Sequence, residues 1–119
     1  MLDKMIKVCE DNGWKVDGYE GGNGKYYEIG NHSPAGENFF FTINAENATE
    51  FAEEIRIYAA EFDIDTHIEL WVDARHAGAS GVPSTRELVK DAEAIDGMLK
   101  QLAEAVTEVE NEGMCNISV

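Results

Sequence analysis

The stretch "ENFFFTINAENATEFAEEIRIYAAEF", residues 37–62, predicts a strand that leads directly into a helix. Its first part is rich in aromatic and β-branched residues, which fit a pleated, half-buried surface. Alternate side chains of a strand point to opposite faces of the sheet, so Phe39 and Phe41 share one face and Phe40 lies on the other. The strand therefore presents aromatic side chains to both of its faces.

A helix is predicted from Asn47 onward. Asn47 is followed three positions later by Glu50, which is the spacing of a capping box. Apolar residues then recur at helical spacing and form the stripe expected in the core, which consists of Phe51, Ile55, Tyr58 and Phe62.

The residues before this stretch predict another helix and a hairpin. Residues 2–12 carry apolar side chains at helical spacing, and Gly13 supplies a C-terminal stop. "WKVDGYE" and "KYYEIG" are alternating, aromatic-rich runs on either side of "GGNG", a strong turn signal. With residues 37–43 as the third strand, a three-stranded antiparallel sheet is expected.

Residues 66–76 fit either a strand or a helix, because their apolar side chains alternate and also share one helical face. Thr66 with Glu69 supplies a capping box and Gly78 supplies a stop. These signals favour a helix.

The longest predicted helix covers residues 85–110 and begins at a capping box of Ser84 and Glu87. Its apolar residues step by four and three positions through Leu88, Ala92, Ile95, Leu99, Leu102, Val106 and Val109. This heptad seam is typical either of a long helix laid across the sheet or of a dimeric coiled coil. Gly97 lies outside the seam and costs about 1 kcal/mol of helix stability relative to alanine.

Together these elements predict an α+β fold in a single domain, residues 1–119, with an N-terminal helix, a three-stranded antiparallel sheet and two or three helices. No apolar run approaches the roughly 18 residues of a membrane span, and the N-terminal residues do not resemble a signal peptide. Cys9 and Cys115 are too few for a secreted disulfide scaffold. Reduced thiols in a cytoplasmic protein are therefore expected, with one end-to-end bridge as the alternative.

Charge is the unusual property of this chain. It has 24 acidic and 9 basic residues, a net charge of −15. Affinity for nucleic acid comes from lysine and arginine, so direct DNA or RNA binding is excluded first, and anionic membrane surfaces are repelled as well. Basic proteins are attracted, and salt screens that attraction.

The acidic residues concentrate in two regions. Arg56 is the only basic residue between Tyr26 and Ala74, against eleven acidic ones, and no basic residue follows Lys100. The expected partner contacts are Glu46, Glu50, Glu53, Glu54, Asp63, Asp65 and Asp73, with Glu104 and Glu108 as a second patch. Like charges one turn apart and acids near a helix C-terminus both cost stability, so the second patch calls for a reason.

One reason is mimicry of nucleic acid, in which carboxylates stand in for phosphates opposite lysine and arginine. B-DNA presents a charge every ~1.7 Å of its axis, whereas acids one turn apart on a helix recur every ~5–6 Å. A single helix is too sparse, so the two patches would have to act together or be joined across a dimer. The alternative is a solvated face on an acidic protein, such as those of halophiles.

Residues of catalytic type occur in the turn before the third strand. His32, Ser33 and Glu37 supply a base, a nucleophile and an orienting acid. Short polar side chains in a turn more often cap backbone groups, and the sequence does not show the required geometry. No catalytic residue is assigned.

Metal-ligand types occur further along the chain, at His67, Glu69, Asp73 and His76. They contain no histidine pair one turn apart on one helical face, and a zinc site needs three or four converging ligands. Solvated side chains are the favoured interpretation. No metal or cofactor is assigned.

The strings "EIGNHSPAGENFFFTI" and "GVPSTRELVKDAEAIDGMLKQLAEAV" resemble a group of small, acidic, uncharacterised proteins from phages and mobile elements of gut Firmicutes. The resemblance covers roughly residues 14–106, and "SPAGENFFF" and "GVPSTRELVKDAE" are its most recognisable pieces. It implies no enzymatic activity and no catalytic residue. Small acidic proteins of mobile elements are frequently inhibitors of host defence, including anti-restriction and anti-CRISPR proteins, so it implies an inhibitor.

The leading hypothesis is a non-enzymatic inhibitor in the bacterial cytoplasm that binds a basic, nucleic-acid-binding surface of a host defence nuclease. An RNA-guided CRISPR nuclease is the expected partner. The alternative is a homodimeric accessory protein of a mobile element, with the heptad seam as its interface and its charge serving solubility. A small hydrolase or metal-dependent enzyme is the third hypothesis.

Overall fold

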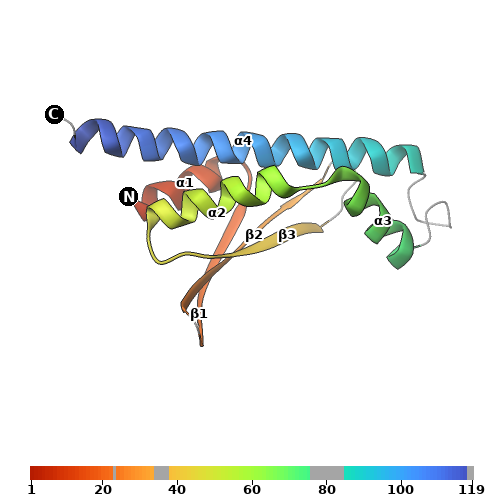
Figure 1. Ribbon diagram of the computed structural model, residues 1–119, viewed down its shortest axis with the longest axis horizontal. Coiled ribbons are helices and arrows are strands. Elements are labelled where there is room, and N and C mark those ends of the chain that lie inside the picture. The colour runs from red at the N-terminus through yellow and green to blue at the C-terminus, as the bar shows by residue number, and fades with distance from the viewer. Residues whose placement is uncertain (23, 34–37, 76–84, 118–119) are drawn as a thin grey trace.

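The computed structural model of the chain describes residues 1–22, 24–33, 38–75 and 85–117. Its elements confirm the α+β architecture and the order expected from the sequence. In chain order they are α1 (Leu2–Asp11), β1 (Lys15–Gly21), β2 (Gly24–His32), β3 (Asn38–Asn44), α2 (Ala48–Glu61), α3 (Ile64–Arg75) and α4 (Thr85–Ile117). Figure 1 shows α1 and α2 between the sheet and α4, whose length sets the longest of the three dimensions, 57 × 31 × 22 Å.

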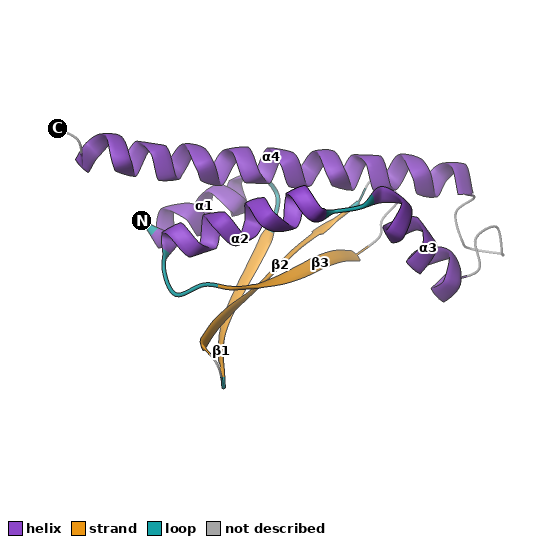
Figure 2. Cartoon of the chain, viewed as in Figure 1, coloured by secondary structure: helices purple, strands orange, loops and turns teal. Residues whose placement is uncertain are grey.

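The three strands form one antiparallel sheet in the order β1-β2-β3, as Figure 2 shows. The predicted hairpin is confirmed, because β1 pairs with β2 up to Gly21 opposite Gly24. Gly24 has a φ of 133°, which a residue with a side chain rarely adopts. One face of the sheet is covered by helices and the other is open. Phe39 and Phe41 are buried on the covered face, while Phe40 is 56% exposed, as the alternation predicted.

An aromatic cluster joins the sheet to the helices. The Phe39 ring contacts five other rings at centroid distances of 5.8 to 6.4 Å: Trp14, Phe41, Tyr58, Phe62 and His67. Phe41 and Tyr58 stack face to face with centroids 4.2 Å apart. The predicted stripe of α2 is confirmed, since Phe51 and Ile55 are fully buried and Tyr58 and Phe62 are partly buried.

The heptad seam of α4 is buried inside the chain. Its members Leu88, Ala92, Ile95, Leu99, Leu102 and Val106 expose 3% of their surface or less, and Val109 is partly buried. The helix contacts α1, α2 and α3, so it lies across the helical layer rather than directly on the sheet. The seam is therefore filled within one chain, and a homodimer would need a different surface.

Two boundaries differ from the sequence-based prediction. The helix at residues 66–76 is confirmed in kind, but it begins at Ile64, and Thr66 and Glu69 do not start it. The carboxylate of Asp63 accepts hydrogen bonds from the backbone N–H groups of Asp65 at 2.9 Å and Thr66 at 3.2 Å, so Asp63 caps the helix.

The long helix also differs in extent. It continues to Ile117, seven residues beyond its predicted end at residue 110. Its predicted cap Ser84 lies outside the described residues, as does Gly78, the predicted stop of the preceding helix.

The stop predicted for the N-terminal helix is confirmed. Gly13 follows α1 with a φ of 91°.

Cys9 is a buried, free thiol in the core. Burial, with a smaller contribution from the nearby Glu10 carboxylate, raises the pKa of Cys9 from 9.0 to about 12. The thiol is therefore protonated at neutral pH and unreactive in the folded chain. Because Cys9 is free, the alternative of an end-to-end bridge to Cys115 is not formed in this structure.

Replacing Ile95 by aspartate is expected to unfold the chain rather than to separate two folded subunits. The aspartate would place an unpaired charge where the wild-type side chain has no exposed surface, at a cost of about 4 kcal/mol. Circular dichroism and analytical ultracentrifugation measure both properties, and Gln101→Asp on the exposed side of α4 is the control. A folded Ile95→Asp monomer derived from a dimeric wild type would show that the seam joins subunits.

Replacing Gly97 by alanine is expected to stabilise the protein by about 1 kcal/mol. Gly97 is exposed on α4, and an added Cβ atom would meet no other atom within 4 Å. Urea denaturation of both proteins measures the change. A loss of stability would instead show that α4 needs the glycine backbone at this position.

Candidate functional site

Arg56 is turned toward α4 and is bound there. Its Nη1 atom donates hydrogen bonds to Thr107 Oγ1 at 3.1 Å and to Glu110 Oε1 at 3.2 Å. Glu110 thereby neutralises the only basic side chain between residues 26 and 74. The interaction fixes α2 against α4 and leaves the other side of α2 without a positive charge.

The opposite side of α2 is acidic. Residues two positions apart on a helix are rotated by about 200°, so Glu54 lies on the flank opposite Arg56, and Glu61 follows two turns later. Asp63 and Asp65 follow along the chain, in the turn before α3 and in its first turn. Among the described residues, none of these four carboxylates forms an ion pair. We call Glu54, Glu61, Asp63 and Asp65 the acidic flank.

Two of the predicted contact residues serve the fold. The backbone N–H of Glu50 donates to Asn47 Oδ1 at 2.9 Å, and the Glu50 carboxylate accepts from the Glu46 N–H at 3.2 Å. This confirms the predicted capping box, although the backbone N–H that the Glu50 carboxylate accepts from is that of Glu46, while Asn47 donates to it through its side-chain amide at 3.4 Å. Glu46 also accepts a long hydrogen bond, 3.4 Å, from the backbone N–H of Lys25. The Glu50 side chain therefore has a structural role at the start of α2, independent of any contact with another protein.

The remaining predicted contacts do not form one face with the acidic flank. Glu53 is exposed and lines a groove together with Arg56 and Glu110. Glu104 and Glu108 are exposed on α4 and line a shallow pocket with Arg56, on the far side of α2. Asp73 belongs to α3, but its side chain lies outside the described residues. The two predicted patches thus lie on different sides of α2, and the structure does not join them into one surface.

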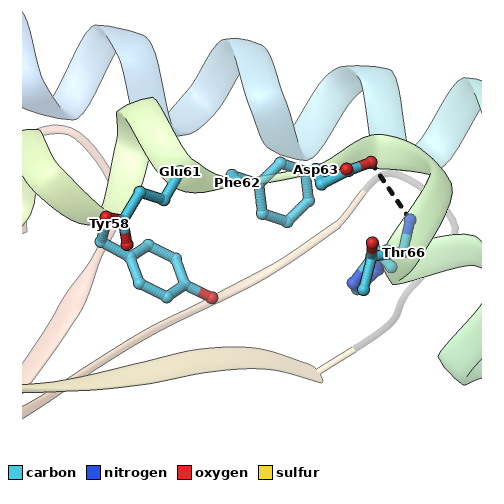
Figure 3. Close-up of a pocket in the computed structure, with 6 residues that line it drawn as sticks. Tyr58, Glu61, Phe62, Asp63 and Thr66 are labelled. Atoms are coloured by element: carbon cyan, nitrogen blue, oxygen red, sulfur yellow. Dashed lines mark hydrogen bonds between the residues drawn. The ribbon is translucent and has the colours of Figure 1, made fainter.

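A pocket of about 490 Å³ opens where α2 meets α3. It is lined by Tyr58, Glu61, Phe62, Asp63, Thr66 and His67. Figure 3 shows Tyr58 and Glu61 on one side of this junction pocket and Thr66 on the other. The rings of Phe62 and His67 lie 5.4 Å apart, and Tyr58 rests on Phe41 in the core. The aromatic walls are therefore held by the core, and the acids lie at the opening.

The electrostatics of the junction pocket favour a positive charge. The C-terminal end of α2 contributes partial negative charge and the N-terminal end of α3 contributes partial positive charge, so the two helix ends oppose each other, and the net sign comes from the carboxylates of Glu61 and Asp63. Burial raises the pKa of Tyr58 above its ordinary value of 10.0, so its hydroxyl stays neutral and does not add to the negative charge at physiological pH. The pocket combines aromatic faces with negative charge, and the sequence did not predict it.

A larger groove, of about 870 Å³, lies between the first turns of α1 and α2 and the C-terminal half of α4. Met1, Leu2 and Met5 give it an apolar side. The N-terminal ends of two helices contribute partial positive charge there, and Glu46 and Glu53 contribute negative charge. The groove therefore has no consistent sign of charge.

The residues considered for catalysis are not assembled into a site in the part of the chain that the structure describes. Ser33 is buried, His32 is exposed, and the backbone N–H of His32 donates to Asn31 Oδ1 at 2.8 Å. Glu37 lies outside the described residues. Asn31 and His32 belong to the end of β2 and pair with Phe39 and Asn38, so the turn expected at these positions begins later, and the Asn31 side chain bonds the backbone of the strand end.

The structure shows no candidate metal site within residues 1–22, 24–33, 38–75 and 85–117. No three histidine, cysteine, aspartate or glutamate side chains converge there. His76 and the side chain of Asp73 fall outside this description. Within the same residues, no helix is both long enough and apolar enough to span a membrane.

Comparison of the chain with protein-family models, with curated proteins and with solved structures finds no match. The site must therefore be interpreted from its own geometry.

Reversing the charge of Glu50 is expected to destabilise the fold, whereas reversing that of Glu54 is not. Glu50→Lys removes the acceptor for the Glu46 N–H and places a positive charge at a helix N-terminus, which costs about 1 kcal/mol. Glu54 has no described partner, so Glu54→Lys should stay within about 0.5 kcal/mol of wild type. Urea denaturation of both variants measures this. Equal free energies of unfolding for the two variants would mean that the Glu50 carboxylate contributes nothing to stability.

Proposed function

We propose that this protein is a non-enzymatic inhibitor that binds a basic, nucleic-acid-binding surface of another protein and excludes the nucleic acid. The observation that supports it best is the acidic flank, whose four carboxylates have no ion pair among the described residues. The nearest arginine, Arg56, is bound to α4 on the other side of the helix. A one-sided negative surface of this kind is complementary to clustered lysine and arginine.

The proposed binding combines attraction at a distance with charge-assisted hydrogen bonds at contact. A net charge of −15 speeds the encounter with a basic partner, and the rate falls as salt is added. At contact, carboxylates one or two turns apart bond to separate cationic side chains of the partner. Their spacing is wider than that of phosphates, so the protein competes for the cations without copying the shape of a duplex.

The proposed partner is a host defence nuclease, with an RNA-guided CRISPR nuclease as the leading choice. Such enzymes hold their heteroduplex in a positively charged channel. The choice rests on the resemblance of "SPAGENFFF" and "GVPSTRELVKDAE" to proteins of phages and mobile elements, and on the charge. The homodimeric accessory alternative is less favoured, because the seam expected at its interface is buried within one chain.

The test uses a purified RNA-guided nuclease and a fluorescent DNA target. The wild-type protein is expected to block DNA binding, measured by fluorescence anisotropy, and the inhibition is expected to weaken between ~0.05 and ~0.5 M salt. The double variant Glu54→Lys, Glu61→Lys should weaken inhibition at least about tenfold, because it reverses half of the acidic flank.

Glu104→Lys, Glu108→Lys is the matched control, with the same change in net charge on the far side of α2. Inhibition that responds equally to both double variants would show that only net charge matters. Loss of inhibition in the control variant alone would show that the binding surface lies on α4. Absence of inhibition by the wild type would remove this class of nuclease as the partner.

A further inference from the structure

The junction pocket differs from the rest of the acidic surface because it is a recess with aromatic walls. All four carboxylates of the acidic flank lie at exposed or half-exposed positions, but only Glu61 and Asp63 line the pocket. In the pocket, the rings of Tyr58 and Phe62 provide apolar faces close to the carboxylates of Glu61 and Asp63. A cation that enters it gains contact with the rings as well as with the acids.

We infer that the junction pocket receives one arginine side chain of the partner protein. This inference rests on the proposed function and deepens it, because it names the residue type that anchors the complex. The guanidinium would lie against an aromatic face and bond to the Glu61 carboxylate at the opening. The volume of about 490 Å³ falls within the ~300–1,000 Å³ typical of ligand pockets.

Arginine fits this pocket better than the other charged groups. Its planar, weakly hydrated guanidinium stacks on aromatic rings and bonds carboxylates with two N–H groups at once. Lysine is a strongly hydrated point charge that loses more by leaving water. Phosphate and other anions are opposed by the carboxylates of Glu61 and Asp63.

The position of the pocket also favours an anchor. Tyr58 stacks on Phe41, and Phe62 and His67 both contact Phe39, so its walls are fixed by the aromatic cluster. Asp63 is held by two backbone N–H groups at the start of α3. Little side-chain freedom is lost when a ligand enters a site already ordered in this way.

The probes are three nine-residue peptides, GSKGXGKSG, in which X is arginine, citrulline or lysine. Citrulline has the shape of arginine without its charge. NMR titration is expected to show the arginine peptide binding at least about tenfold more tightly than the citrulline peptide, because bonds to charged groups are the stronger ones. The shifts should concentrate on Tyr58, Phe62 and His67.

The variant Glu61→Gln and its control Glu53→Gln each remove one negative charge from an exposed position of α2. Glu61 lines the junction pocket, and Glu53 lines the larger groove beside Arg56. Neither carboxylate has a described partner, so both variants should fold. Glu61→Gln is expected to weaken binding of the arginine peptide about fivefold or more. Glu53→Gln is expected to weaken it less than about twofold.

Equal weakening by Glu61→Gln and Glu53→Gln, or equal affinity of the arginine and lysine peptides, would overturn the arginine site. Shifts spread over α2 and α4 would do the same. None of these results affects the proposed inhibition, which the nuclease assay tests by itself. Conversely, a selective arginine site with no inhibition of the nuclease would leave the pocket standing and point to a different basic partner.

Discussion

The contacts of Phe39 and Phe41 hold the sheet, α2 and α3 in one arrangement. Phe39 touches rings from the β1 side of the sheet, from α2 and from α3, and Phe41 carries the stacked ring of Tyr58. The junction pocket lies where α2 meets α3, and these ring contacts fix the positions of both helices relative to the sheet. Apolar packing therefore positions the helices that carry the acidic residues around the pocket, and Asp63 is held in addition by two backbone N–H groups of α3.

Most of the fold could be predicted from the sequence because its signals are local. Strand alternation at residues 38–44, the hairpin turn and the capping box at Asn47 each depend on a few neighbouring residues. The seam of α4 shows the limit of such signals. Burial against a second copy and burial against α1 and α2 produce the same heptad spacing, so only the tertiary structure separates the two.

The candidate site was predicted in composition but not in geometry. The sequence showed which residues are acidic, and it could not show that Arg56 turns toward α4 or that Glu50 is used in a cap. The sequence favours Thr66 as the α3 cap because Glu69 follows it at capping-box spacing, whereas Asp63, the actual cap, has Thr66 at that spacing and not a glutamate or glutamine. The pocket depends on the contacts of Phe62 and His67 with Phe39, which lies more than twenty positions earlier in the chain, and no spacing rule identifies them.

The unpaired acids also set how the protein responds to its ionic surroundings. A large net charge repels itself and opposes the compact state, so added ions stabilise the folded chain by screening that repulsion. The same ions weaken attraction to a basic partner. Folding and the proposed association would therefore have opposite dependences on salt, and the proposed complex would be tightest under the conditions in which the free protein is least stable.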